Sequence, residues 1–149
     1  MTIKVAKIED LPRILEIRYD AIIENSAQTY SPREIKILLQ DANLAELREM
    51  ILDQKLFIAY VEQQIVGLTG WKDLTLKHVY IDPKFERRGI ASKLVMHTQQ
   101  DYITRTKNNI LKTGCVLYAV DFYQKQGFEI IHQVKDWDGS EYYQMEKKL

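Results

Sequence analysis

The stretch of residues 76–94, LKHVYIDPKFERRGIASKL, constrains the fold more than any other part of the chain. Leu76–Ile81 has the composition of a strand, and Asp82-Pro83 ends it because proline cannot donate to a sheet ladder. Apolar residues at helical spacing then predict a helix over Gly89–Thr104, followed by a strand over Ile110–Val116. A strand, a helix and a second strand in this order form a crossover between parallel strands, which indicates an α/β fold.

Sequence signals elsewhere predict the remaining elements. Ser31-Pro32-Arg33-Glu34 is a capping box with proline at the first helical position. The other expected elements are a strand near residues 3–5, a helix that Asp10 caps, a helix after Ser31 with Ala42 on its apolar face, a helix over Leu44–Leu52, strands Leu56–Val61 and Ile65–Trp71 joined at Gln63-Gln64, a helix Tyr118–Gln126 closed by Gly127, and strands Glu129–Val134 and Tyr142–Glu146 joined through Asp138-Gly139. We expect one domain over residues 1–149, with a mixed sheet of about seven strands and about four helices.

Composition narrows the classes of function. The chain has 21 basic and 21 acidic residues, and this balance disfavours binding to nucleic acid or to a membrane surface. Its single cysteine, Cys115, excludes an internal disulfide framework and a cysteine metal cluster. The N-terminal MTIKVAKIEDL becomes charged too early for a signal peptide, and no apolar run reaches the length of a membrane span. We therefore expect a soluble cytoplasmic protein without a metal.

The corner at Glu86–Leu94 has the features of an anion site. The N-terminus of a helix carries unpaired N–H groups and partial positive charge, which suits phosphate. Gly89 lets a ligand approach the backbone, and Arg87 and Arg88 add charge. The P-loop pattern and the three-glycine dinucleotide fingerprint are both absent. On these residues alone, a plain turn with solvated arginines is an equal alternative to a phosphate site.

A second motif favours the phosphate site. Residues 119–128, AVDFYQKQGF, contain an A-x-x-F-Y-x-x-x-G-F pattern about 30 residues after the corner. Together the two motifs resemble the GNAT superfamily of acetyl-CoA-dependent N-acetyltransferases, and the order of elements agrees over essentially the whole chain. The resemblance implies a mostly antiparallel sheet that splays open at the cofactor site. Glu86 departs from the family, which has glutamine or arginine there, so a side-chain contact from this position to the cofactor is in doubt.

The resemblance also implies the residues that bind coenzyme A and acetyl-CoA. The backbone of Val79, Tyr80 and Ile81 would pair with the pantetheine arm, and the amides of the corner would hold the pyrophosphate. The cofactor-binding residues expected in this way are Val79, Tyr80, Ile81, Arg87, Arg88, Gly89, Ile90, Ala91, Ser92 and Phe122. Phe122 has an alternative role as a packing residue.

The catalytic assignments follow from the same resemblance. Tyr123 matches the family's proton donor to the leaving thiolate, with a buried core aromatic as the alternative. The base that takes the proton of the amine stays open; the weak candidates are His78, Asp73, Glu24 and Tyr30. Tyr30, Tyr80 and Trp71 could line an acceptor pocket or fill the core. Cys115 is expected to be buried in its strand, without a covalent role.

The expected activity is transfer of an acetyl group to a primary amine of a small molecule or a protein by direct attack. A non-catalytic acyl-CoA-binding module is the alternative: Glu86 and the lack of an obvious base favour it, whereas Tyr123 does not. A nucleic-acid role for the basic residues at the corner is disfavoured by the zero net charge. The acceptor cannot be identified, although the 136–141 loop, DWDGSE, borders its expected site. Because late strands in this family often pair between subunits, a homodimer is a further expectation.

Overall fold

The computed structural model describes residues 1–40, 44–135 and 139–149. The elements are β1 (Thr2–Val5), η1 (Ile8–Asp10), α1 (Leu11–Ser26), α2 (Pro32–Gln40), α3 (Leu44–Leu52), β2 (Leu56–Val61), β3 (Gln64–Lys72), β4 (Thr75–Ile81), η2 (Pro83–Phe85), α4 (Ile90–Thr106), β5 (Ile110–Val116), η3 (Leu117–Ala119), α5 (Val120–Lys125), β6 (Glu129–Lys135) and β7 (Glu141–Lys148). In the described part of the chain, no helix has the length and apolar character that a membrane crossing requires.

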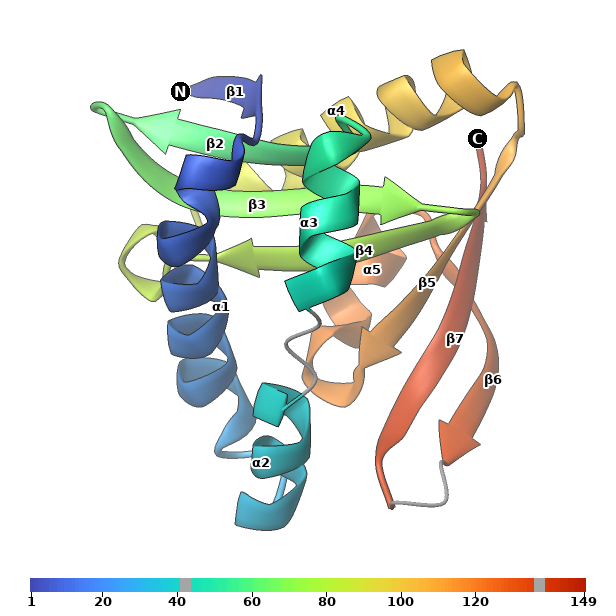
Figure 1. Cartoon of the computed structure of the whole chain (residues 1–149). Coiled ribbons are helices and arrows are strands. Elements are labelled where there is room, and N and C mark those ends of the chain that lie inside the picture. Colours follow the sequence, from blue (N-terminus) through green and yellow to red (C-terminus); the bar gives the residue numbers. More distant parts are fainter. Residues whose placement is uncertain (41–43, 136–138) are drawn as a thin grey trace.

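The seven strands form one sheet in the order β1-β2-β3-β4-β5-β7-β6 (Figure 1). Every neighbouring pair is antiparallel except β4 and β5, which run parallel on either side of the α4 crossover. The predicted mixed, mostly antiparallel sheet is therefore confirmed. The described residues hold five α-helices, which correspond to the five helical segments expected one by one and are one more than the approximate total of four.

Helices cover both faces of the sheet. In Figure 1, α1 and α3 lie in front of β2, β3 and β4, and α4 lies behind them. The alternation of side chains along β2 serves both layers: Phe57 and Ala59 join the core under α4, whereas Leu56 and Ile58 join the core under α1 and α3. Two apolar cores on opposite faces of one sheet therefore hold the helices in place.

Some local predictions were confirmed and others were wrong. The capping box is present, since the Ser31 N–H donates to Glu34 Oε1 at 3.0 Å and the Glu34 N–H donates to Ser31 Oγ at 3.2 Å. The turn between β2 and β3 uses Glu62 and Gln63, both at positive φ, instead of Gln63-Gln64. Asp10 does not cap α1 with its side chain; its carboxylate accepts from the Lys7 N–H instead. Ala42, predicted on the apolar face of a helix, and Asp138, predicted in a turn, lie outside the described residues.

The sheet splits between β4 and β5. Only two residue pairs, Thr75–Lys112 and Leu76–Thr113, join these strands, and β5 then turns to pair along its full length with β7 (Figure 1). Residues 77–81 of β4 consequently have no ladder partner on the β5 side within the described chain. The predicted splay is thus confirmed, and it leaves one edge of β4 facing a gap in the middle of the sheet.

Candidate functional site

A pocket of about 390 Å³ occupies the split between β4 and β5. Its walls come from the C-terminal part of α1, the end of β4, the corner before α4, the first turn of α4, and the segment from η3 to α5. The lining residues are Ala21, Asn25, Val79, Tyr80, Ile81, Phe85, Glu86, Arg87, Gly89, Ile90, Ala91, Ser92, Tyr118, Ala119, Phe122 and Tyr123. Of the predicted cofactor-binding residues, only Arg88 is not in this wall; its guanidinium lies 5.0 Å from the ring centre of Phe85.

The corner that forms one end of the pocket has an unusual backbone. Gly89 stands at the N-cap of α4 with φ of 77°, and Arg87 also has a positive φ of 61°. A side chain on Gly89 would meet no atom within 4 Å, so the space in front of this residue is open. Glycine has no side chain to cap the helix, and the N–H groups of the first turn of α4 are left to another acceptor. This geometry suits an anion that binds main-chain amides.

The first turn of α4 is held against α5. The Gln126 side chain, just after α5, donates from Nε2 to Ser92 Oγ at 2.8 Å. Gly127 follows with φ of 94°, which ends α5 as predicted. The Phe128 N–H donates to the carbonyl of Tyr123 at 3.0 Å, and these contacts fix the short helix that carries the predicted catalytic tyrosine.

Glu86 points toward α1. Its Oε1 accepts a hydrogen bond of 2.9 Å from Asn25 Nδ2. The two side chains bridge the pocket wall from the corner to the last turn of α1. The residue that departs from the family pattern therefore has a partner within the protein, and the amides of the corner do not depend on its side chain.

Tyr123 lies at the inner end of the split, and only 7% of it is exposed. Burial raises the pKa of its phenol well above the ordinary value of 10.0, and nearby Cys115 and Tyr80 raise it further, whereas a hydrogen bond to the Thr113 side chain opposes the rise. Thr113 is the last β5 residue paired with β4, so this phenol lies close to the point where the ladder ends. It stays protonated at neutral pH and can donate a proton there.

Sequence reasoning missed four side chains of the pocket. Tyr118 faces Tyr80 across the split, and burial raises the pKa of Tyr118 to about 12, with Tyr80 contributing. Ala21 and Asn25 close the pocket from α1, and Phe85 does so from η2. Tyr118 lies just after β5, the strand that borders the split, and this position was the one sequence signal that could have identified it as a pocket residue. The contribution of α1 depends on how it packs across β4, which no local pattern shows.

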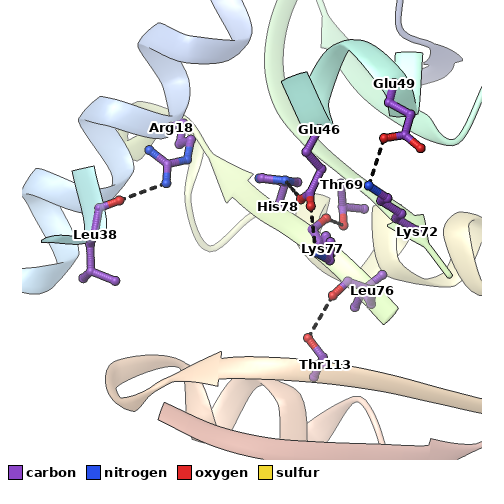
Figure 2. A network of polar contacts seen from close by, with 10 residues as sticks. All are labelled: Arg18, Leu38, Glu46, Glu49, Thr69, Lys72, Leu76, Lys77, His78 and Thr113. Carbon is purple, nitrogen blue, oxygen red and sulfur yellow. Dashed lines mark hydrogen bonds and ion pairs between the residues drawn. The ribbon is translucent and has the colours of Figure 1, made fainter. Parts of the chain in front are cut away.

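The candidate bases are scattered. His78 is on β4 but its ring is turned to α3, where Nε2 lies 2.9 Å from Glu46 Oε1 (Figure 2). Asp73 is exposed at the turn before β4, and Glu24 is exposed on α1; neither lines the pocket. Tyr30 is buried, its hydroxyl accepting from the Leu117 N–H at 2.6 Å and donating to the Glu141 carbonyl at 3.3 Å. The structure thus brings none of these four into the pocket wall, and only His78 lies on a strand that borders it.

Two further residues are structural. Trp71 is buried under α4, where its Nε1 donates to Asp101 at 2.7 Å, so of the two roles expected for it the structure shows the core role. Cys115 is fully buried in β5 as predicted, and burial raises the pKa of its thiol to about 12. A thiol in that state is not a nucleophile at neutral pH. Tyr80, in contrast, does line the pocket.

The pocket fits coenzyme A in chemical character. Its corner offers main-chain amides and Arg87 to a pyrophosphate, and its walls along β4 and α5 are mainly apolar. The edge of β4 that faces the split lies between these two parts. Among the described residues, we find no group of three or more His, Cys, Asp or Glu side chains that could hold a metal ion.

Comparison with known proteins agrees with this geometry. A family model described as "Acetyltransferase (GNAT) domain" matches residues 26–149. An uncharacterized N-acetyltransferase of Escherichia coli (strain K12), YafP, is 23% identical over 124 residues, which cover 83% of this chain and 78% of that protein.

Two solved structures share the fold. The GCN5-related N-acetyltransferase from Rhodopseudomonas palustris superimposes with a TM-score of 0.85 at 19% identity, covering 99% of this chain and 95% of that one. The PaiA N-acetyltransferase from Thermoplasma acidophilum, solved in complex with coenzyme A, has a TM-score of 0.77 at 18% identity and covers 99% and 98%. At such identities the likeness concerns the fold.

Proposed function

This chain belongs to the GNAT family of acetyltransferases, and from that premise we propose that it transfers an acetyl group from acetyl-CoA to a primary amine of a small molecule or a protein. The attack is direct, without an acyl-enzyme intermediate. The observation that carries the proposal is the pocket in the split of the sheet, whose one end is the α4 corner and whose other end is the buried Tyr123.

The corner and β4 would hold the cofactor. The amides at the start of α4 and the side chain of Arg87 suit the pyrophosphate, because they combine N–H donors with the positive end of the helix dipole. The edge of Val79–Ile81 that faces the split suits the amides of the pantetheine arm. Bound acetyl-CoA supplies a thioester carbonyl that an amine can attack and a thiolate that can leave.

The chain supplies a proton donor and a dipole for this chemistry. Tyr123 is neutral at physiological pH and donates its proton to the leaving sulfur. The β4 backbone beside the split offers amide dipoles that can polarise the thioester carbonyl. Cys115 remains a thiol and takes no part. The resulting mechanism needs no metal and no covalent enzyme intermediate.

Calorimetric binding of acetyl-CoA and of free coenzyme A tests the cofactor site. The variant is Gly89→Ala, and the matched control is Gly139→Ala, because both glycines have positive φ and open space where a Cβ would be. Each substitution strains the backbone by about 1–2 kcal/mol, but only Gly89 lies at the pocket. We expect micromolar binding that Gly89→Ala weakens and Gly139→Ala leaves unchanged.

The possible outcomes separate the two functions. Binding together with acetyl transfer to members of an amine panel, detected by release of free thiol, supports the enzyme. Binding without transfer to any amine favours an acyl-CoA-binding module. Folded wild-type protein that binds neither ligand would mean that the chain has kept only the fold of the family.

A further inference from the structure

An irregularity in β4 turns two consecutive side chains to the same face. Leu68 pairs with Tyr80 and Gly70 with Lys77, so β4 holds one residue more than β3 between these pairs. His78 lies in this bulge with φ of 61°, a conformation that is uncommon for a residue with a side chain. Lys77 and His78 consequently both reach α3, where they meet the same carboxylate (Figure 2).

That carboxylate is Glu46, which binds one residue with each oxygen. Its Oε1 lies 2.9 Å from His78 Nε2, and its Oε2 accepts from Lys77 Nζ at 2.9 Å. The hydrogen bond to His78 lowers the pKa of Glu46 to about 2; burial opposes this, and Lys77 adds to it. An ionised carboxylate only accepts hydrogen bonds, so the Nε2 of a neutral His78 must carry the proton. Its Nδ1 is then left with the lone pair.

The bulge lies next to the pocket. Tyr80, two residues along β4, belongs to the core on the α1 and α3 face and also lines the pocket. About 10% of the His78 side chain is exposed, so the side chain is not completely closed off from solvent. The charged and titratable groups around His78 are Glu46 from α3, Lys77 and Tyr80 from β4, and Arg18 from α1, whose guanidinium lies 5.5 Å from the Tyr80 ring centre.

We propose that Glu46 is a positioning residue that holds His78 in the Nε2–H tautomer, so that His78 Nδ1 accepts the proton of the acceptor ammonium, directly or through one water. This inference rests on the proposed function and adds the base that it lacks. The ammonium gives one proton to Nδ1, which passes it to solvent, and the neutral amine then attacks. Tyr123 donates its proton to the sulfur as the thiolate leaves. The nitrogen then loses a second proton, and this proton returns to Tyr123.

Nuclear magnetic resonance tests the tautomer without any substrate. Long-range proton–nitrogen correlation on the apo protein, with His78 assigned by loss of its signals in His78→Gln, distinguishes the two neutral tautomers. We expect Nε2–H in the wild type and a mixture in Glu46→Gln, because an amide can both donate and accept. Glu49→Gln is the matched control, because Glu49 is on the same helix as Glu46 but pairs with Lys72 of β3, and it should leave the signals unchanged. An Nδ1–H tautomer in the wild type overturns the proposal.

Two probe amines test the proton transfer. n-Butylamine is charged at pH 7, whereas 2,2,2-trifluoroethylamine is mostly neutral and needs no base before attack. For n-butylamine, we expect His78→Gln to lower kcat/KM by roughly 10²–10⁴ and Glu46→Gln to lower it less. For trifluoroethylamine, both variants should retain wild-type kcat/KM.

The controls separate this inference from the proposed function. One outcome is that wild-type protein binds coenzyme A and acetylates both amines, and that His78→Gln is as active as wild type on both. This result overturns the role of His78 as a base but supports the proposed enzyme activity. Equal losses on both amines indicate a structural role for the pair and also overturn it. If wild-type protein binds coenzyme A but acetylates neither amine, the proposed activity is contradicted. The role of His78 as a base is then contradicted as well, whichever tautomer is found.

Discussion

Arg13 on the first turn of α1 and Asp82 directly after β4 form an ion pair with 2.6 Å between Nη2 and Oδ2. The Arg13 Nε also donates to the Ile65 carbonyl on β3 at 3.1 Å, and Asp82 Oδ1 accepts from the Lys84 N–H at 3.0 Å. One buried carboxylate thus links α1, the sheet and the start of the corner that leads to Gly89. The position of the cofactor corner relative to α1 depends on this pair.

Asp82→Asn should destabilise the protein by about 1.5–3 kcal/mol at pH 7, because it removes a charged partner from Arg13. Burial alone would raise the pKa of Asp82, but the Lys84 N–H and Arg13 outweigh it and the pKa lies below 3.8. The stabilisation is therefore present above about pH 4 and is lost as pH falls through the lowered pKa. Urea unfolding of wild type and variant across this range should show their difference shrinking in acid.

Glu16→Gln is the control for that series. Glu16 also pairs with Arg13, but its side chain is 61% exposed, so the substitution should change the free energy of unfolding by less than about 1 kcal/mol. Equal losses from Asp82→Asn and Glu16→Gln, or a difference between Asp82→Asn and wild type that does not shrink as the pH falls, would contradict the assigned role of Asp82.

Glu86→Gln should strengthen binding of coenzyme A. The carboxylate lines the pocket beside Arg87, so its negative charge lies near the proposed pyrophosphate site. Glutamine keeps an oxygen that can accept from Asn25 Nδ2, so the wall should hold its shape. Calorimetry should show a gain of a few-fold that decreases with added salt. Pantetheine, which lacks the phosphates, should bind both proteins alike; an equal gain for pantetheine would disprove the electrostatic cause.

The features predicted correctly from the sequence are those with a local cause. The Ser31–Glu34 box and Gly89 act within a few residues of themselves, and the crossover follows from the order of the elements around it. The features that were missed depend on pairs far apart in the chain. Glu46 meets His78 across 32 residues, and no pattern near either residue indicates the contact.

Aromatic residues show the same limit. Tyr30 and Tyr80 were equal candidates for an acceptor pocket, yet the hydroxyl of Tyr30 is used by the backbone of residues 117 and 141, and only Tyr80 borders the pocket. A tyrosine has the same local signal in a core and in a binding site, so only its tertiary neighbours decide. The bulge that carries His78 is likewise invisible in the sequence. Histidine is among the residues enriched at positive φ, but one histidine within a run typical of a strand does not mark a bulge.

Cys115→Ala should leave acetyl transfer unchanged. Direct attack needs no cysteine, and burial holds the pKa of this thiol at about 12. The cost should appear in stability, about 1 kcal/mol in urea unfolding, because the residue is fully buried in the core under α4. In wild type an aromatic disulfide reagent should react with the thiol only after denaturant is added. Rapid labelling of the folded protein, or loss of transfer in the variant, would reopen a covalent route.

Tyr123→Phe should lower kcat by roughly 10²–10⁴ while coenzyme A affinity stays the same, because phenylalanine keeps the ring and loses only the proton donor. Tyr102→Phe is the matched control: Tyr102 is also buried, and its hydroxyl donates to the Ile110 carbonyl at 2.7 Å, away from the pocket. That variant should lose stability but not kcat. Because burial raises the pKa of Tyr123 above its ordinary value, the donor stays protonated and kcat should show no falling limb below about pH 10. A falling limb near neutral pH, or equal kcat in Tyr123→Phe and wild type, would assign the proton to another donor.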